Sequence, residues 1–151
     1  MTGNLTFEIM TASATACAAG KCCLLVGECD RRDHALHTVS ASEGCEVTNV
    51  SRLLADIMLA GGTPTPRAFS NALPGDGTTL LSHIELLFLP SLQLDPVDFL
   101  ARLARTRPVC ASWPGTYASG RLRYAGAEHP ECFDSDDQKA IIVDLNQRKD
   151  A

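Results

Sequence analysis

Residues 21–27 read Lys21-Cys-Cys-Leu-Leu-Val-Gly27, an uninterrupted apolar run that stops at a glycine. A short continuous apolar run is typical of a strand that is covered on both faces, as strands of parallel sheets are. Neighbouring side chains of a strand point to opposite faces, so we expect Cys22 and Cys23 to lie on opposite sides of the sheet. The run therefore predicts the first strand of an α/β domain.

Strand and helix patterns alternate along the rest of the chain. Apolar runs predict strands at residues 45–50, 78–81, 109–113 and 140–145, and an exposed alternating strand is expected at 121–125. Helices are expected at 5–19, 33–42, 51–59 and 95–105, and stretches rich in proline and glycine at 61–66 and 74–77 are expected to be loops. The last of these helices has Asp95 as its N-cap and Pro96 at its first position. This alternation predicts a mostly parallel sheet with helices on both faces.

Length and composition indicate one ordinary globular domain. A chain of 151 residues buries roughly two-thirds of its unfolded surface, so residues 1–151 are expected to form a single domain, with an N-terminal helix within 1–19 and a short polar tail at 146–151. The net charge of -5 argues against a surface that binds nucleic acid as a whole, although a local basic face remains possible. Seven cysteines without a C-x-x-C pair suit a reducing compartment, and the N-terminal stretch is a poor signal peptide or membrane span. We expect a cytoplasmic protein with no membrane contact.

Six short motifs follow one another in a fixed order between residues 20 and 145. They are Lys21 to Gly27, Thr79-Leu-Leu-Ser-His-Ile-Glu-Leu-Leu-Phe88, Leu94-Asp-Pro96, Ala111-Ser-Trp-Pro-Gly115, Gly120-Arg-Leu-Arg-Tyr124 and His129-Pro-Glu131. In this order and spacing they resemble the small P-loop protein of BREX phage-defence systems, the BrxF-type family. The resemblance implies a P-loop NTPase-like fold of the RecA/AAA kind. It also implies partners among larger ATPase, methyltransferase and phosphatase-like subunits, and a homo-oligomer stays an open alternative.

The phosphate-binding motif that this resemblance implies is degenerate. A working loop reads G-x-x-x-x-G-K-[ST], because backbone amides wrap the phosphates, the lysine neutralises them and the hydroxyl holds Mg²⁺. From Gly27 the chain has Arg32 at the second glycine, Asp33 at the lysine and His34 at the hydroxyl. A carboxylate about 5 Å from a phosphate charge repels it by roughly 3 kcal/mol at an effective dielectric constant near 20. Asp30 or Asp33 is instead expected to cap the following helix, while Arg31 and Arg32 leave open a weakened anion site there.

The metal-binding motif is degenerate in the same way. The family pattern has an aspartate at the end of its apolar strand, where this chain has Ser82. Glu85 matches a family position and is a catalytic candidate only if the site is active; without lysine or metal ligand we expect it to be structural. No cofactor and no metal site are therefore expected, and ATP with Mg²⁺ is at most a weak ligand.

Three functions remain open from the sequence. The first is an adaptor or assembly subunit of a BREX-type system that does not hydrolyse ATP. The second is an unorthodox NTPase that uses Arg31 or Arg32 in place of the lysine and is completed by oligomerisation. The third is a DNA-binding subunit that uses Arg102 and Arg105, with Trp113 stacking on a base or anchoring a partner. The arginines equally suit the negative end of a helix dipole, and the tryptophan equally suits the core.

Overall fold

Five parallel strands form the central sheet of the computed structural model, which describes residues 2–75, 77–126 and 128–147. The strands are β1 (Cys22–Val26), β2 (Val47–Asn49), β3 (Thr79–Ser82), β4 (Val109–Ser112) and β8 (Ala140–Asp144), and their order in the sheet is β2-β3-β4-β1-β8. All four pairings between neighbours are parallel. The predicted α/β class with a parallel sheet is confirmed, and each predicted strand of this sheet is present with ends that differ by no more than two residues.

β1 is the best-buried strand of this sheet. It pairs with β4 on one side and with β8 on the other, and none of its residues is more than 2% exposed. Cys22 packs in the hydrophobic core on one face of the sheet and Cys23 in the core on the other, as the alternation predicted. The apolar run that decides the fold is therefore buried from all four sides.

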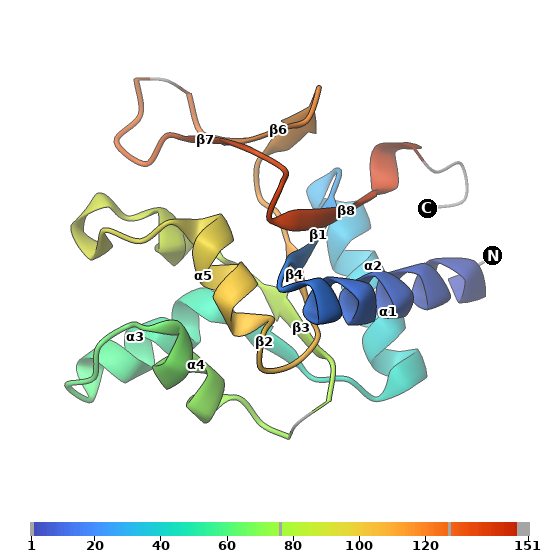
Figure 1. The fold of residues 1–151 in the computed structure, drawn as a ribbon, viewed down its shortest axis with the longest axis horizontal. Coiled ribbons are helices and arrows are strands. Elements are labelled where there is room, and N and C mark those ends of the chain that lie inside the picture. Colours follow the sequence, from blue (N-terminus) through green and yellow to red (C-terminus); the bar gives the residue numbers. More distant parts are fainter. Residues whose placement is uncertain (1, 76, 127, 148–151) are drawn as a thin grey trace.

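Helices cover both faces of the sheet (Figure 1). One face carries α1 (Thr2–Ala19) and α2 (Cys29–Glu43), whose buried side chains share a core with Cys23 and Leu25. The other face carries α3 (Val50–Leu59), α4 (Pro66–Ala72) and α5 (Pro96–Leu103), which pack against Leu24 and its neighbours. Within the described residues, no helix combines the length and the apolar character that a membrane span needs.

The helix ends follow local signals in the sequence, with two corrections. Asp95 caps α5 by accepting a hydrogen bond from the backbone N–H of Asp98 at 3.0 Å. Gly44 ends α2 in the left-handed conformation, with φ of 71°. However, α2 begins at Cys29 instead of residue 33, and α4 was not predicted at all. The prolines near residue 65 indicated a loop, but Pro66 occupies the first turn of α4, where a missing N–H costs nothing.

A small antiparallel sheet follows β4 along the chain. It consists of β5 (Thr116–Ala118), β6 (Arg121–Tyr124) and β7 (Phe133–Asp136), of which only β6 was predicted. Three 3-10 segments, Glu85–Phe88, Pro90–Leu92 and Leu145–Gln147, complete the described structure. Asn146 and residue 147 thus belong to the last of these segments and not to a tail, and residues 148–151 lie outside the described part.

Trp113 joins the small sheet to the end of β4. Its side chain is fully buried, and its indole N–H points at the carbonyl oxygens of Thr116 and Arg123, both 3.3 Å away. The ring lies edge-on to Phe88 and Phe133, and Phe88 stacks on Tyr124 at 4.0 Å between centroids. Trp113 is therefore a core residue that fastens the small sheet, and not a surface on which a base or a partner stacks.

Gly115 makes this junction possible, and its replacement tests the packing. A Cβ atom at this position would lie 1.7 Å from the carbonyl oxygen of Arg123, so Gly115→Ala must push β6 away. We expect the free energy of unfolding, measured by urea titration, to fall by about 2–3 kcal/mol. Gly126→Ala is the control, because no atom lies within 4 Å of its added Cβ. Equal stability of the two variants would contradict the close approach at Gly115.

Candidate functional site

The connection from β1 to α2 contains only two residues, Gly27 and Glu28. Gly27 has φ of 139°, and a Cβ atom there would lie 3.0 Å from Cβ of Leu145, so both backbone conformation and space favour glycine. α2 then starts at Cys29 with Glu28 as an N-cap whose side chain makes no capping hydrogen bond. The chain is already helical where a phosphate loop would be extended, and the predicted cap by Asp30 or Asp33 is wrong. Asp30 lies in the first turn of the helix, where its charge suits the dipole.

Arg32 fills the space that the short connection leaves at the carboxyl edge of the sheet. Its Nε donates a hydrogen bond to the carbonyl oxygen of Gly27 at 2.9 Å, and its Nη1 donates to Oγ of Ser112 at 2.6 Å. Ser112 is the last residue of β4 and stands in register with Leu25 of β1. One side chain, only 9% exposed, thus ties the start of α2 to the ends of the two neighbouring strands.

Arg31 makes a second tie at the same edge. Its Nη1 donates a hydrogen bond to the carbonyl oxygen of Leu145 at 3.2 Å. Leu145 opens the 3-10 segment that follows β8, so this contact reaches the strand on the other side of β1. The two arginines thus donate hydrogen bonds to atoms of the protein at the ends of β1, β4 and β8. Those donors are not available to a ligand.

The charge of Arg32 is not neutralised by a neighbour. Within residues 2–75, 77–126 and 128–147, no carboxylate forms an ion pair with it, and its Nη2 has no hydrogen-bond partner in the protein. Burying a guanidinium is costly unless its donors are satisfied, so the contacts to Gly27 and Ser112 offset only part of the desolvation. The edge therefore carries a buried positive charge, and the Nη2 group of Arg32 is a hydrogen-bond donor without a partner among the described residues.

Within the described residues, Asp33 and His34, the predicted lysine and hydroxyl positions, make no hydrogen bond or ion pair with Gly27, Ser112 or Leu145. Both side chains are exposed on α2, and Oδ2 of Asp33 accepts a long contact from the thiol of Cys29 at 3.8 Å. The reason is the early start of the helix, which turns Arg32 inward with Ala35, Leu36 and Val39 and turns Asp33 outward. The expected repulsion between Asp33 and a phosphate at this edge stays a prediction.

Ser82 and Glu85 belong to β3 and to the 3-10 segment that follows it. β3 pairs with β4 in a register that aligns Leu81 with Ala111, so Ser82 ends its strand beside Ser112. The Oγ of Ser82 makes a long hydrogen bond of 3.5 Å to the carbonyl oxygen of Thr48. Glu85 opens the first 3-10 segment and is half-buried. Burial, followed by the charges of Glu131 and Glu85, raises the pKa of Tyr124. Neither residue makes a hydrogen bond or an ion pair with Arg31 or Arg32 in the described structure.

A cavity of about 350 Å³ opens at the same edge, between the β1–α2 connection and the small sheet. It is lined by one acidic side chain and six uncharged residues: Val26, Gly27, Glu28, Gly115, Thr116, Tyr117 and Asn146. The hydroxyl of Tyr117 donates to Oδ2 of Asp137 at 2.6 Å, and this hydrogen bond is the main cause of its raised pKa. The lining contains no cationic side chain that could pair with a phosphate. In the described part of the chain, no group of three His, Cys, Asp or Glu side chains is placed to hold a metal.

Arg102 and Arg105 lie at the other end of the sheet, because α5 leads into the start of β4. Nε of Arg102 is 2.7 Å from Oδ2 of Asp98, and Oδ1 of Asp98 is 3.0 Å from Nζ of Lys139. The hydrogen bond from Lys139, with a further one from Arg102, holds the pKa of Asp98 below its usual value. These arginines therefore form no part of the edge that carries Arg32.

Comparison with known proteins adds no relative to this description. The chain matches no family model, no curated protein and no solved structure. The resemblance to the BrxF-type family accordingly stays a prediction from the motifs.

Ser112 is the residue of this edge that sequence reasoning missed. The signal for Arg32 was present, because positions 32, 35, 36 and 39 have the spacing of one helix face. To predict the inward position of Arg32, this charged residue had to be counted with the apolar residues of the same helix face. No sequence pattern points from Arg32 to a serine 80 positions away.

Loss of the Arg32 side chain is expected to destabilise the protein. Arg32→Ala removes two hydrogen bonds from a charged donor, and we expect the free energy of unfolding to fall by about 2–3 kcal/mol in urea titrations. Arg31→Ala is the matched control, with the same charge change and one longer bond, and should cost roughly 1 kcal/mol. A smaller effect at Arg32 than at Arg31 would contradict the tie described above.

Proposed function

We propose that the chain is an adaptor or assembly subunit on a P-loop-like fold that does not hydrolyse ATP. The observation that carries this proposal is the placement of Arg32. Its guanidinium lies at the edge where a phosphate loop would hold a nucleotide, bonded to Gly27 and Ser112 of the same chain. A loop of two residues before α2 offers no ring of backbone amides to a triphosphate.

The strand order supports the finer assignment of the fold. β4 lies between β1 and β3, with β8 beyond β1, which is the order expected of a RecA-like P-loop sheet. The β1–α2 connection then corresponds to the phosphate loop, and the end of β3 to the metal-binding position. Under this proposal the chain keeps the strand order of a P-loop sheet, while the side chain of Arg32 takes the place of a nucleotide phosphate.

The biological setting rests on the motif resemblance alone. It makes the chain a cytoplasmic component of a BREX-type phage-defence system, with larger ATPase, methyltransferase or phosphatase-like subunits as partners. Seven free cysteines in the structure suit a reducing compartment. Co-purification of the tagged chain with the products of its genomic neighbours tests this setting separately from the chemistry.

Isothermal titration with ATP and Mg²⁺ tests the chemistry. We expect no binding at micromolar nucleotide and no turnover, because the connection is short and Arg32 is engaged. Asp33→Lys should not create binding, since Asp33 is exposed on α2. Micromolar affinity with measurable hydrolysis in the wild type would overturn the proposal.

A second candidate, an unorthodox NTPase completed in an oligomer, is favoured by one observation. The buried charge of Arg32 has no carboxylate partner among the described residues, and its Nη2 has no partner there in the protein. An anion arriving from solvent or from another subunit would find a donor at this point. This candidate requires nucleotide binding by the wild type that Arg32→Ala abolishes and Arg31→Ala weakens.

A further inference from the structure

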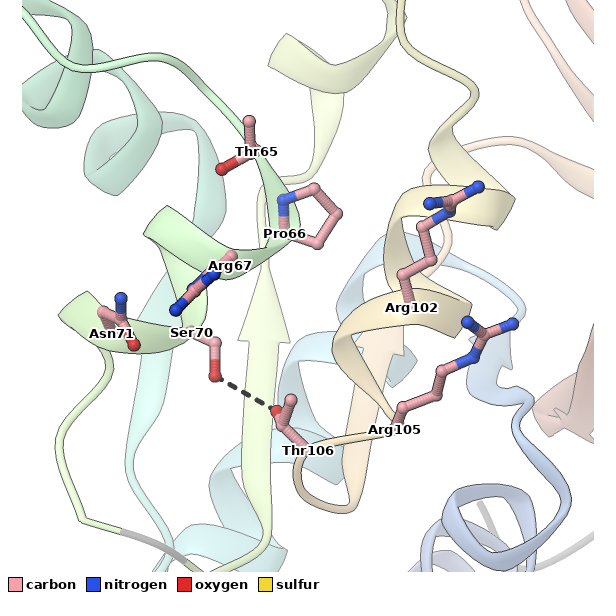
Figure 2. Close-up of a pocket in the computed structure, with 8 residues that line it drawn as sticks. All are labelled: Thr65, Pro66, Arg67, Ser70, Asn71, Arg102, Arg105 and Thr106. Atoms are coloured by element: carbon pink, nitrogen blue, oxygen red, sulfur yellow. Dashed lines mark hydrogen bonds between the residues drawn. The ribbon is translucent and has the colours of Figure 1, made fainter.

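A second cavity, of about 510 Å³, lies between α4 and the end of α5, on the face of the sheet opposite α1 and α2 (Figure 2). Oγ of Ser70 and Oγ1 of Thr106 are 3.1 Å apart and join its two walls. Thr106 donates its hydroxyl hydrogen to the carbonyl oxygen of Leu103 at 2.8 Å, so Ser70 is the donor to Thr106. The walls are therefore held together before any ligand arrives, and the volume is within the range of ligand sites. We call this cavity the α4–α5 groove.

The α4–α5 groove concentrates positive charge in an acidic protein. Its lining contains Arg67, Arg102 and Arg105 and no acidic residue, whereas the whole chain has a net charge of -5. Asp98 pairs with Arg102 from outside the lining. Arg67 and Arg105 are exposed and make no ion pair or side-chain hydrogen bond within the described residues. Two guanidinium groups are therefore free to meet an anion.

The positions of the arginines indicate how the negative charges of a matching ligand are distributed. In Figure 2 the heads of Arg102, on α5, and of Arg105, in the turn after α5, extend away from α4, and Arg67 stands on the opposite wall, on α4. Positive charge therefore lies on both walls of the groove. An extended chain with several separated negative charges meets both walls, so the groove suits such a chain.

Two features argue against nucleic acid as that chain. Its lining contains no aromatic residue, which single-stranded nucleic acid needs for base stacking. The protein as a whole is acidic, unlike proteins that bind duplex DNA through a basic face. The guanidinium fork forms two parallel hydrogen bonds with a carboxylate as it does with a phosphate, so these two features decide between the two chains; the proline ring and arginine stems offer apolar contact to a backbone. We propose that the α4–α5 groove binds an acidic peptide segment of a partner protein. This inference concerns a different face from the Arg32 edge and holds whether or not nucleotide binds there.

Fluorescence anisotropy with the full chain tests the inference. The probe is a fluorescein-labelled peptide of eight residues that alternates glutamate and alanine, and its counterpart has glutamine in place of glutamate. We expect the glutamate peptide to bind, with an affinity that falls as salt rises, and the glutamine peptide not to bind. In the double variant Arg67→Gln and Arg105→Gln, affinity should fall roughly tenfold, because each exposed charge contact contributes modestly.

Arg52→Gln is the matched control, because Arg52 is exposed on α3 and does not line the groove. It changes the net charge by one in the same direction and should leave peptide affinity unchanged. Equal binding of the glutamate and glutamine peptides, or equal loss in Arg52→Gln and in the double variant, would overturn the inference. Tighter binding of a twelve-nucleotide oligothymidylate that depends on Arg67 and Arg105 would also overturn it and favour a nucleic-acid site.

Discussion

The hydrogen bonds from Arg32 to Gly27 and Ser112 fix how α2 leaves the sheet. β1 ends at Val26 and the helix starts at Cys29, so two residues must reverse the chain without a loop. The guanidinium of Arg32 lies between the end of β1 and the start of α2. It donates hydrogen bonds to the ends of β1 and β4. Because Arg32 faces inward, Leu36 and Val39 face the sheet as well, and α1 packs against the helix so placed. A different orientation at this one residue would turn the whole apolar face of α2 away from the core.

The same edge is covered a second time by the small sheet. Trp113 follows β4 directly and is anchored through its indole N–H to Thr116 and Arg123. The aromatic rings of Phe88, Tyr124 and Phe133 pack around it, so segments on either side of α5 in the sequence meet there. The edge of a parallel sheet where ligands ordinarily bind thus carries two arginines and an aromatic cluster, with a cavity of about 350 Å³ between the β1–α2 connection and the small sheet. This arrangement is the observation behind our proposal that the chain serves in assembly and not in nucleotide chemistry.

Periodicity predicted the sheet and most helices, because their signals are local. The apolar runs of β1 and β4 and the Asp95-Pro96 helix start need no knowledge of the rest of the chain. The start of α2 was misplaced because Cys29 to His34 are polar and hide an inward face that only the fold reveals. β5 and β7 were missed because their stability comes from pairing with β6 and from the aromatic cluster, not from their own alternation. The site was predicted in its location, at Gly27 to Arg32, but not in its contacts, which depend on Ser112 and Leu145 far along the chain.

The central claim is that Arg32 closes the edge by bonding to Ser112, and a double-mutant cycle measures that bond most directly. The free energy of unfolding is determined for the wild type, Arg32→Ala, Ser112→Ala and the double variant. A charge-assisted bond of 2.6 Å in the interior predicts a coupling energy of roughly 1–2 kcal/mol between the two positions. Additive effects of the two substitutions would contradict the account, because Arg32 would then hold neither the strand end nor the closed edge.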